Sequence, residues 1–261
     1  MNRELLREFW KYRELFYFLA WRDIKVRYKQ TALGVAWAIL QPFLTMIVFT
    51  LLFGRLAKMP SDGIPYPIFY FGALLPWMYF SATMTNSSNS LVANASLITK
   101  VYFPRIILPS SLAISGLVDF SIGCVLLLGT LAYYGVTPEW AWLMWPVLLV
   151  PLVVLALGVS MLLAALNVRY RDVKYALPFL IQLLLFVTPV IYPTSIVPER
   201  YRFILALNPL SGIIDAFRSS LVPVKPIDWQ LLAFSLVVIL AIFSLGFTYF
   251  RRTERTFADI V

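Results

Sequence analysis

The sequence contains no histidine and only one cysteine, Cys124. The absence of histidine excludes histidine metal sites, catalytic triads built on a histidine base and histidine proton relays. A lone cysteine excludes a disulfide framework, and since Cys124 lies within an apolar run we expect a small buried side chain. The chain can then recognise a ligand or partner only through its shape, its charges and its hydrogen bonds.

Nucleotide-binding and hydrolytic motifs are also missing. No glycine is followed by lysine, so there is no G-x-x-x-x-G-K-[ST] phosphate loop, and the chain has no D-x-D pair and no G-x-S-x-G sequence. These absences indicate a protein that is not itself an enzyme and holds no metal or cofactor. Any energy for uphill transport must then come from a separate subunit.

Charged residues are scarce, at 13% of the chain, whereas 61% of the residues are hydrophobic. A soluble domain averages about 25% charged and about 45–50% apolar residues, so the excess apolar surface indicates an integral membrane protein. The net charge of +9 is spread between the apolar runs. This placement favours a role in membrane topology over nucleic-acid binding.

Long apolar runs predict an all-α membrane protein with six transmembrane helices. The first run, residues 33–53, reaches about 31 Å as a helix, which matches a hydrocarbon core of about 30 Å. The other five expected spans are 66–85, a stretch within 106–134, 141–166, 176–192 and 229–250. We expect one transmembrane domain over residues 1–261, made of a leader (1–32), the bundle (33–250) and a tail (251–261).

The basic residues predict the orientation of the six spans. Sixteen Lys and Arg residues fall on the side of the two termini, and six fall on the other side. The positive-inside rule therefore predicts that both termini are cytoplasmic.

The leader predicts an amphipathic interface helix. Trp21, Ile24 and Tyr28 recur at helical spacing, and a basic stripe lies one position further on. Such a helix lies in the membrane plane with its basic side toward phosphates or protein. The alternative is a basic anchor that only sets topology. The candidate interface residues are Trp21, Arg22, Lys25, Arg27, Tyr28 and Lys29.

Residues 93–109, ANASLITKVYFPRIILP, predict a short helix that ends at Lys100 on the cytoplasmic side. Asn94 or Ser96 would cap this helix, and the prolines after it would stiffen the approach to the third span. The alternative is an ordinary connecting loop.

Polar residues also occur within or beside the spans. Residues 86–90, NSSNS, must face protein or water, which suits either a hydrophilic pathway or hydrogen bonds between helices. Asp119 lies near the middle of the third span with no obvious Lys or Arg partner in a span, so it is a functional candidate. Alternatively, Gln41 or Gln182 could satisfy it as a structural hydrogen-bond partner.

Aromatic residues are abundant, and some lie inside the expected spans, where their faces are compatible with a carbohydrate pathway. The Pro-rich segment 193–228 contains an apolar stripe at helical spacing, formed by Ile213, Ile214, Phe217 and Leu221. A segment of this length and content is unlike a solvent-exposed loop. It could dip back into the outer leaflet where protein covers its backbone.

Five segments in this order resemble the permease subunit of type-2 ABC exporters that export polysaccharides such as O-antigen, capsule or teichoic acid. They are WRDIKVRYKQTALGVAWAILQP (21–42), KVYFPRIILP (100–109), NVRYRDVKYALPFL (167–180), TPVIYP (188–193) and NPLSGIIDAFR (208–218). The resemblance implies a homodimer with two copies of a cytoplasmic ATP-binding subunit, which carries ATP and Mg²⁺. It further implies re-entrant helices between spans five and six.

The resemblance also assigns roles to residues. A cytoplasmic coupling helix would dock on the ATPase through Asn94, Ser96, Leu97, Thr99, Lys100, Tyr102, Pro104 and Arg105. The conduit for a lipid-linked glycan at the dimer interface has as candidates Trp37, Gln41, Phe43, Phe69, Tyr70, Asn86, Asn89 and Asp119. The expected location is the bacterial inner membrane.

Three other functions compete with this expectation. A type-2 ABC exporter of a drug or small lipid would share the architecture. An intramembrane glycan transferase needs clustered carboxylates on a cytoplasmic loop, where Asp172 stands alone. A purely structural membrane subunit would have no ATP-binding partner.

Overall fold

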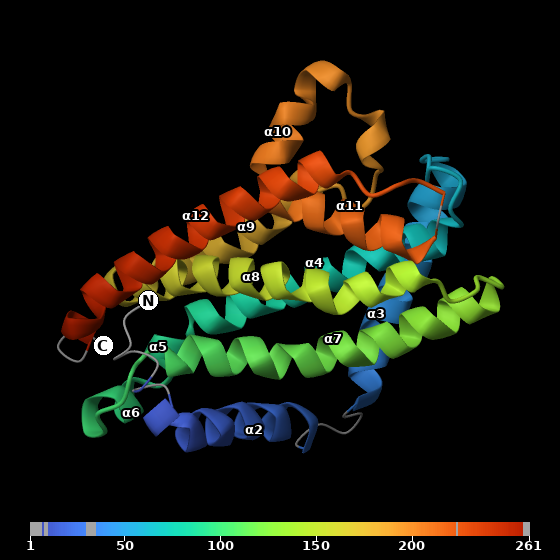
Figure 1. Cartoon of the computed structure of the whole chain (residues 1–261). Helices are drawn as coiled ribbons and strands as arrows, with labels where there is room; N and C mark the ends of the chain where they lie inside the picture. Colours follow the sequence, from blue (N-terminus) through green and yellow to red (C-terminus); the bar gives the residue numbers. More distant parts are fainter. Residues whose placement is uncertain (1–6, 8–9, 30–34, 223, 258–261) are drawn as a thin grey trace.

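The computed structural model describes residue 7 and residues 10–29, 35–222 and 224–257 (Figure 1). The first residues of the expected leader, the start of the expected first span and the last four residues of the tail lie outside the described residues. Every regular element that is described is a helix. The predicted all-α fold is therefore confirmed for this part of the chain.

Eight helices form the body of the part of the chain that the structure describes. They are α2 (Arg13–Lys29), α3 (Val35–Phe49) with its π-helical continuation η1 (Thr50–Leu56), α4 (Tyr66–Ser88), α7 (Ile107–Tyr133), α8 (Met144–Arg169), α9 (Val173–Val187), α11 (Pro209–Leu221) and α12 (Trp229–Thr253). The shorter described elements are α5 (Ser90–Ala93), α6 (Ala95–Lys100), η2 (Trp140–Leu143), η3 (Thr194–Ile196), η4 (Glu199–Tyr201), α10 (Arg202–Leu207) and η5 (Glu254–Thr256).

Four described helical stretches are long and apolar enough to cross a membrane. These are Ala36–Leu56, Ile107–Tyr133, Trp140–Arg169 and Trp229–Thr253. Helices α4 and α9 lie where the second and fifth spans were expected, but α9 has only 15 residues and α4 becomes rich in Ser, Thr and Asn toward its end. The structure thus supports several membrane spans, while the count of six stays a prediction.

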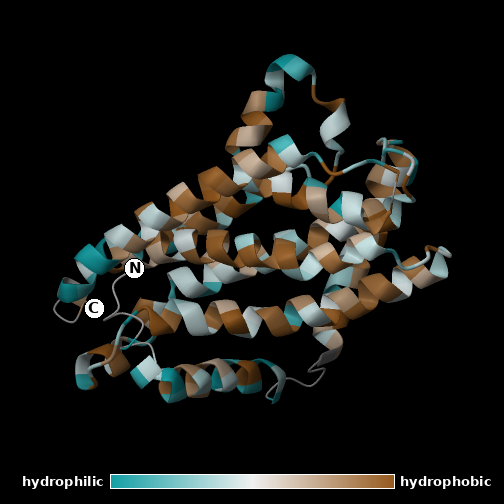
Figure 2. Cartoon of the chain, in the orientation of Figure 1, coloured by the Kyte–Doolittle hydropathy of each residue, from teal (hydrophilic) through white to brown (hydrophobic). Residues whose placement is uncertain are grey.

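Helix α4 lies at the centre of the bundle, between α7 and α8 (Figure 1). Most of its side chains are buried, including aromatic rings along its first half. Figure 2 shows that hydrophobic residues occupy the middle of the long helices, whereas hydrophilic residues gather at the end that holds α6 and the last turn of α12. We call this end the α6 end.

Helices α8 and α12 approach each other closely through two glycines. A Cβ atom added to Gly246 would lie 2.0 Å from the carbonyl oxygen of Gly158, and one added to Gly158 would lie 2.7 Å from Cα of Phe243. Only glycine fits at these positions, because the backbones themselves are in contact. This small-residue contact is typical of helices packed within membranes.

Between α9 and α12 the chain forms the short helix α10, which projects from the bundle, and the buried helix α11 (Figure 1). The predicted stripe of Ile213, Ile214, Phe217 and Leu221 is buried. However, every residue of α11 from Leu210 to Leu221 is buried, including polar and charged side chains. Helix α11 is therefore an internal helix, whereas its re-entrant placement in a bilayer stays a prediction.

Candidate functional site

A cavity of about 790 Å³ lies between α2, α3, α4, α7 and α9. Its wall combines polar side chains with aromatic rings. The polar ones are Arg27, Tyr28, Gln41, Thr45, Ser81, Thr85, Asn86 and Asp119, and the aromatic ones include Trp37, Phe49, Tyr70, Trp77, Tyr79 and Phe120. A wall of this composition offers hydrogen-bond partners and stacking faces in one space, as sugar rings require.

The cavity brings together residues that the sequence had selected separately. Five of the conduit candidates line it, namely Trp37, Gln41, Tyr70, Asn86 and Asp119, together with Arg27 and Tyr28 of the expected interface helix. The other three candidates lie elsewhere. Phe43 is 37% exposed on α3, the ring of Phe69 is buried under a guanidinium, and the side chain of Asn89 is bonded to Asn167.

Asp119 has two partners, both from α2. One carboxylate oxygen forms an ion pair with the Arg27 guanidinium, and the other accepts a hydrogen bond from the Tyr28 hydroxyl. Burial raises the pKa of the Tyr28 phenol, against a smaller lowering by Arg27, so the phenol stays protonated and donates. The expectation that Gln41 or Gln182 would satisfy Asp119 is wrong, because the partners come from the leader rather than from another span.

Helix α2 lies along α7 (Figure 1) and covers the predicted apolar stripe only in part, since Ile24 and Tyr28 are half-buried. Leu19 and Ala20 are buried, whereas Trp21 of the predicted stripe is 46% exposed. The Lys25 ammonium lies over the Trp21 ring, 5.4 Å from its centroid. Lys25 and Lys29 are exposed, so the basic residues remain available to phosphates or to another protein.

A polar link connects α2 to the segment before α6. The guanidinium of Arg22 pairs with Asp23 at 2.8 Å and donates to the side-chain oxygen of Asn94 at 3.5 Å. The amide of Asn94 in turn donates to the carbonyl oxygen of Ser90 at 2.8 Å. The expected interface helix and the expected coupling segment are thus joined at their side chains.

The predicted short helix is confirmed as α6, which ends at Lys100. The predicted side-chain cap is wrong: Asn94 occupies the N-cap position, but its side chain bonds backward to Ser90, and Ser96 lies inside the helix. Two other candidates, Leu97 and Arg105, are half-buried.

The α6 segment has one exposed and one buried face. Its buried side chains are Ile98, Phe103 and Pro104, and its exposed ones are Ser96, Thr99, Lys100, Val101 and Tyr102, the last 71% exposed. This surface at the α6 end is suited to docking because it presents Val101 and the aromatic ring of Tyr102 among polar side chains and rests on a packed base.

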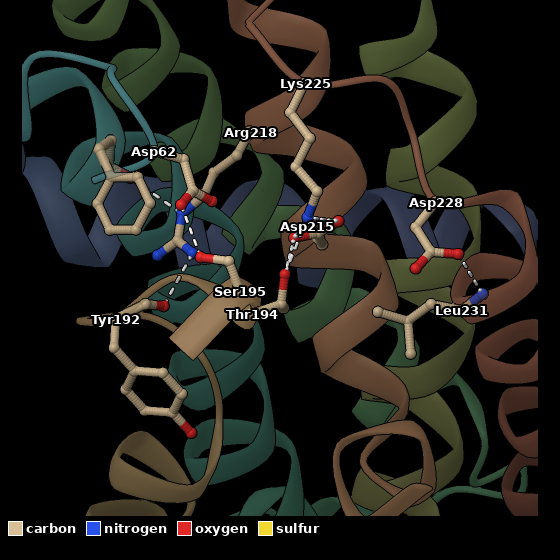
Figure 3. Close-up of polar contacts among 10 residues, drawn as sticks. Asp62, Tyr192, Thr194, Ser195, Asp215, Arg218, Lys225, Asp228 and Leu231 are labelled. Carbon is tan, nitrogen blue, oxygen red and sulfur yellow. Dashed lines mark hydrogen bonds and ion pairs between the residues drawn. The ribbon is translucent and has the colours of Figure 1, made fainter. Parts of the chain in front are cut away.

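A second polar cluster surrounds α11 (Figure 3). The guanidinium of Arg218, only 4% exposed, donates to the carbonyl oxygens of Phe69, Tyr192 and Val190 and stacks on the Phe69 ring at 3.8 Å. It thereby ties α11 to α4 and to the loop after α9.

Asp215, one turn before Arg218 on α11, accepts a hydrogen bond from Thr194 at 2.7 Å and pairs with Lys225 at 3.3 Å. Beside this pair, Ser195 donates to Asp62 at 2.6 Å (Figure 3). All buried charges in this cluster therefore have partners.

Sequence reasoning missed Arg218, Asp215 and Glu254 as buried charged residues. Arg218 and Lys225 are among the six basic residues that the sequence analysis counted on the side opposite the termini, and Glu254 belongs to the charged segment expected as the tail. The sequence does contain a sign that charges are buried near α11, because Asp215 and Arg218 lie among the residues of the apolar stripe formed by Ile213, Ile214, Phe217 and Leu221. Within the described residues, no group of His, Cys, Asp and Glu is arranged to hold a metal ion.

A family model described as ABC-2 type transporter matches residues 14–222. The O-antigen export system permease protein RfbA of Myxococcus xanthus is 34% identical over 218 residues, which cover 82% of this chain and 83% of RfbA. RfbA of Klebsiella pneumoniae is 28% identical over 242 residues, 92% of either protein. The polysialic acid transport protein KpsM of Escherichia coli is 23% identical over 209 residues, which cover 77% of this chain and 79% of KpsM.

Proposed function

Because the chain belongs to the ABC-2 type transporter membrane family, we propose that it is the membrane-spanning subunit of an ATP-driven exporter of a lipid-linked polysaccharide. The names of the similar proteins share the export or transport of a polysaccharide, and their similarity covers more than three quarters of the chain. In this function the chain moves its cargo across the bacterial inner membrane.

The observation that carries the proposal is the cavity beside α3. Five of the eight residues selected as conduit candidates line one space with aromatic and polar walls. Its volume of about 790 Å³ is in the upper part of the range of small-molecule sites, about 300–1,000 Å³. A polymer would pass through such a space a few sugar units at a time.

A second copy of the chain would complete the conduit. Only 11% of the most apolar window of Ala36–Leu56 is buried, and Trp37 and Phe43 are exposed. An apolar helix this open needs lipid or another protein against it. In the proposed homodimer, α3 of each copy faces the other and the two cavities lie on either side of one passage.

The driving force comes from two copies of a cytoplasmic ATP-binding subunit, which bind ATP and Mg²⁺. The exposed surface of α6 and Tyr102 is the proposed docking site, and Arg22 of α2, which donates to Asn94, lies next to it. When ATP draws the two partner subunits together, the coupling helices transmit the movement to α7 and to the cavity wall. This arrangement requires both termini in the cytoplasm, as the 16-to-6 distribution of basic residues supports.

Deletion of the gene in its native host tests this function. We expect surface polysaccharide to disappear and its lipid-linked form to accumulate inside the cell, with both effects reversed by the wild-type chain. The purified complex with its ATP-binding partner should hydrolyse ATP. If deletion leaves surface polysaccharide unchanged, while the complex moves a small amphiphile, the drug or small-lipid alternative is correct.

A further inference from the structure

The short turn η5 that follows α12 buries a carboxylate against the coupling segment. Glu254 is only 6% exposed. Its Oε1 atom accepts the backbone N–H of Arg105 at 2.8 Å, and its Oε2 atom accepts a hydrogen bond from the Arg251 guanidinium at 2.7 Å. Both carboxylate oxygens are therefore used, one for the joint between α6 and α7 and one for α12.

An apolar anchor holds this turn in place. Phe257 is fully buried and packs edge-on against Phe250, with ring centroids 5.3 Å apart. Both rings belong to a buried cluster at the α6 end that also includes Phe103, Ile98 of α6 and Leu19 of α2. The turn, the coupling segment and the leader helix thus share one packed cluster, and Glu254 supplies a directional bond within it.

The bond from Glu254 meets the chain where its backbone is not helical. Helix α6 ends at Lys100 and α7 begins at Ile107, so the intervening residues form the joint through which any movement of α6 must pass. Arg105 stands two residues before α7, at the end of the helix where the peptide dipoles leave a partial positive charge. A carboxylate is well suited to this position.

We infer that Glu254 is a positioning residue for coupling: it fixes the joint between α6 and α7 to the end of α12. Because of this tie, a displacement of α6 moves α7 and α12 together instead of bending the joint at Pro104. The inference rests on the proposed function of the α6 segment as the site where an ATP-binding subunit docks. It adds the C-terminal turn to the parts that carry the movement.

Hydrogen exchange in the assembled complex tests the bond directly. In the wild-type complex the amide of Arg105 should be protected. Glu254→Ala should speed its exchange about ten- to hundredfold, because a hydrogen bond to a charged acceptor is lost. Glu254→Gln should keep most of the protection, because the side-chain oxygen remains. Fast exchange of the Arg105 amide in the wild-type complex overturns the inference without any variant.

Coupling is measured as the amount of polysaccharide exported relative to the rate of ATP hydrolysis. Surface polysaccharide is labelled by periodate oxidation in the complemented deletion strain, and ATP hydrolysis is measured with the purified complex. We expect Glu254→Ala to keep ATP hydrolysis within about twofold and to lower export roughly fivefold or more, the size of a typical coupling energy. Glu254→Gln should retain most export. Glu199→Ala is the matched control, since the Glu199 side chain is 90% exposed on η4, and it should leave export unchanged.

The outcomes separate the inference from the proposed function. If the wild-type chain does not restore surface polysaccharide, the proposed function fails. If the wild-type chain restores it and Glu254→Ala exports as well as Glu199→Ala does, the positioning role is wrong and the proposed function stands. Should Glu254→Ala not assemble, Glu254→Gln decides: loss of export with the Arg105 amide still protected overturns the inference.

Discussion

Replacing Arg218 by alanine should destabilise the protein more than any other single change to a charged residue considered above. The guanidinium donates to the buried carbonyl oxygens of Phe69 and Val190 and to the part-buried carbonyl oxygen of Tyr192, the last drawn in Figure 3. The substitution leaves all three without this donor and opens a space above the Phe69 ring. It also leaves α11 without its tie to α4 and to the loop after α9.

The expected loss follows from these contacts. An unsatisfied buried acceptor costs about 1–3 kcal/mol, and the cation–π contact contributes about 2 kcal/mol when it is desolvated. Part of this lost stability is offset, because folding of the alanine variant no longer has to remove water from a guanidinium group at position 218. We therefore expect Arg218→Ala to lower the free energy of unfolding by about 3–5 kcal/mol, as is typical when one member of a buried charged network is removed. Arg218→Lys should lose about half as much, since an ammonium group cannot reach three divergent oxygens.

The free energy of unfolding is measured by titrating detergent-solubilised protein with dodecyl sulfate and following the far-ultraviolet circular dichroism. Arg202→Ala is the matched control, because its side chain is 56% exposed and has only a 3.9 Å pair with Glu199. That variant should unfold within about 0.5 kcal/mol of the wild type. A loss below 1 kcal/mol for Arg218→Ala would contradict the reasoning, because water would then have to replace the guanidinium at all three carbonyls.

Three further predictions concern helix contact, coupling and the cavity. Gly246→Ala should destabilise the protein by about 3 kcal/mol or more in the same titration, because its Cβ would overlap the Gly158 carbonyl; Gly129→Ala, with nothing within 4 Å, should be neutral. Lys100→Glu should preserve ATP hydrolysis by the complex and lower export, and unchanged export would remove the docking role of α6. Asp119→Asn should weaken the contact between α2 and α7 by about 1–3 kcal/mol and increase proteolysis of α2 in vesicles. Unchanged proteolysis would show that the ion pair between Asp119 and Arg27 does not hold α2 in place.

The long apolar helices could be predicted well from the sequence. Runs such as 229–250 and 141–166 coincide with helices because length and hydropathy alone identify them. Helix α4 was predicted with an end near 85 and continues to Ser88, because its polar last turn is covered by protein. Burial by neighbouring helices, which a single sequence does not reveal, makes a polar helix end compatible with the interior.

Residues of the candidate site could be predicted in type more readily than in arrangement. The family resemblance assigned Trp37, Gln41 and Asn86, polar or aromatic residues within or beside the expected spans, to the conduit, and they line the same cavity. Phe69 satisfied the same criterion but stacks under Arg218. Both environments accept an aromatic ring within a span, so hydropathy and spacing do not distinguish a cavity wall from a structural stack.

The contacts that could not be predicted have a common physical origin. Arg27 and Asp119 are 92 positions apart, and Arg105 and Glu254 are 149 apart. The first pair joins the leader helix α2 to α7, and the second joins the α6–α7 joint to the turn after α12; non-directional apolar packing does not by itself fix the angle between such segments. A directional bond between buried charged or polar groups supplies that angle, and its partner can come from any segment that the fold brings near. Such ties hold α2 and the α6–α7 joint against α7 and α12, which the proposed partner subunit would move, so coupling should depend on them more than insertion does.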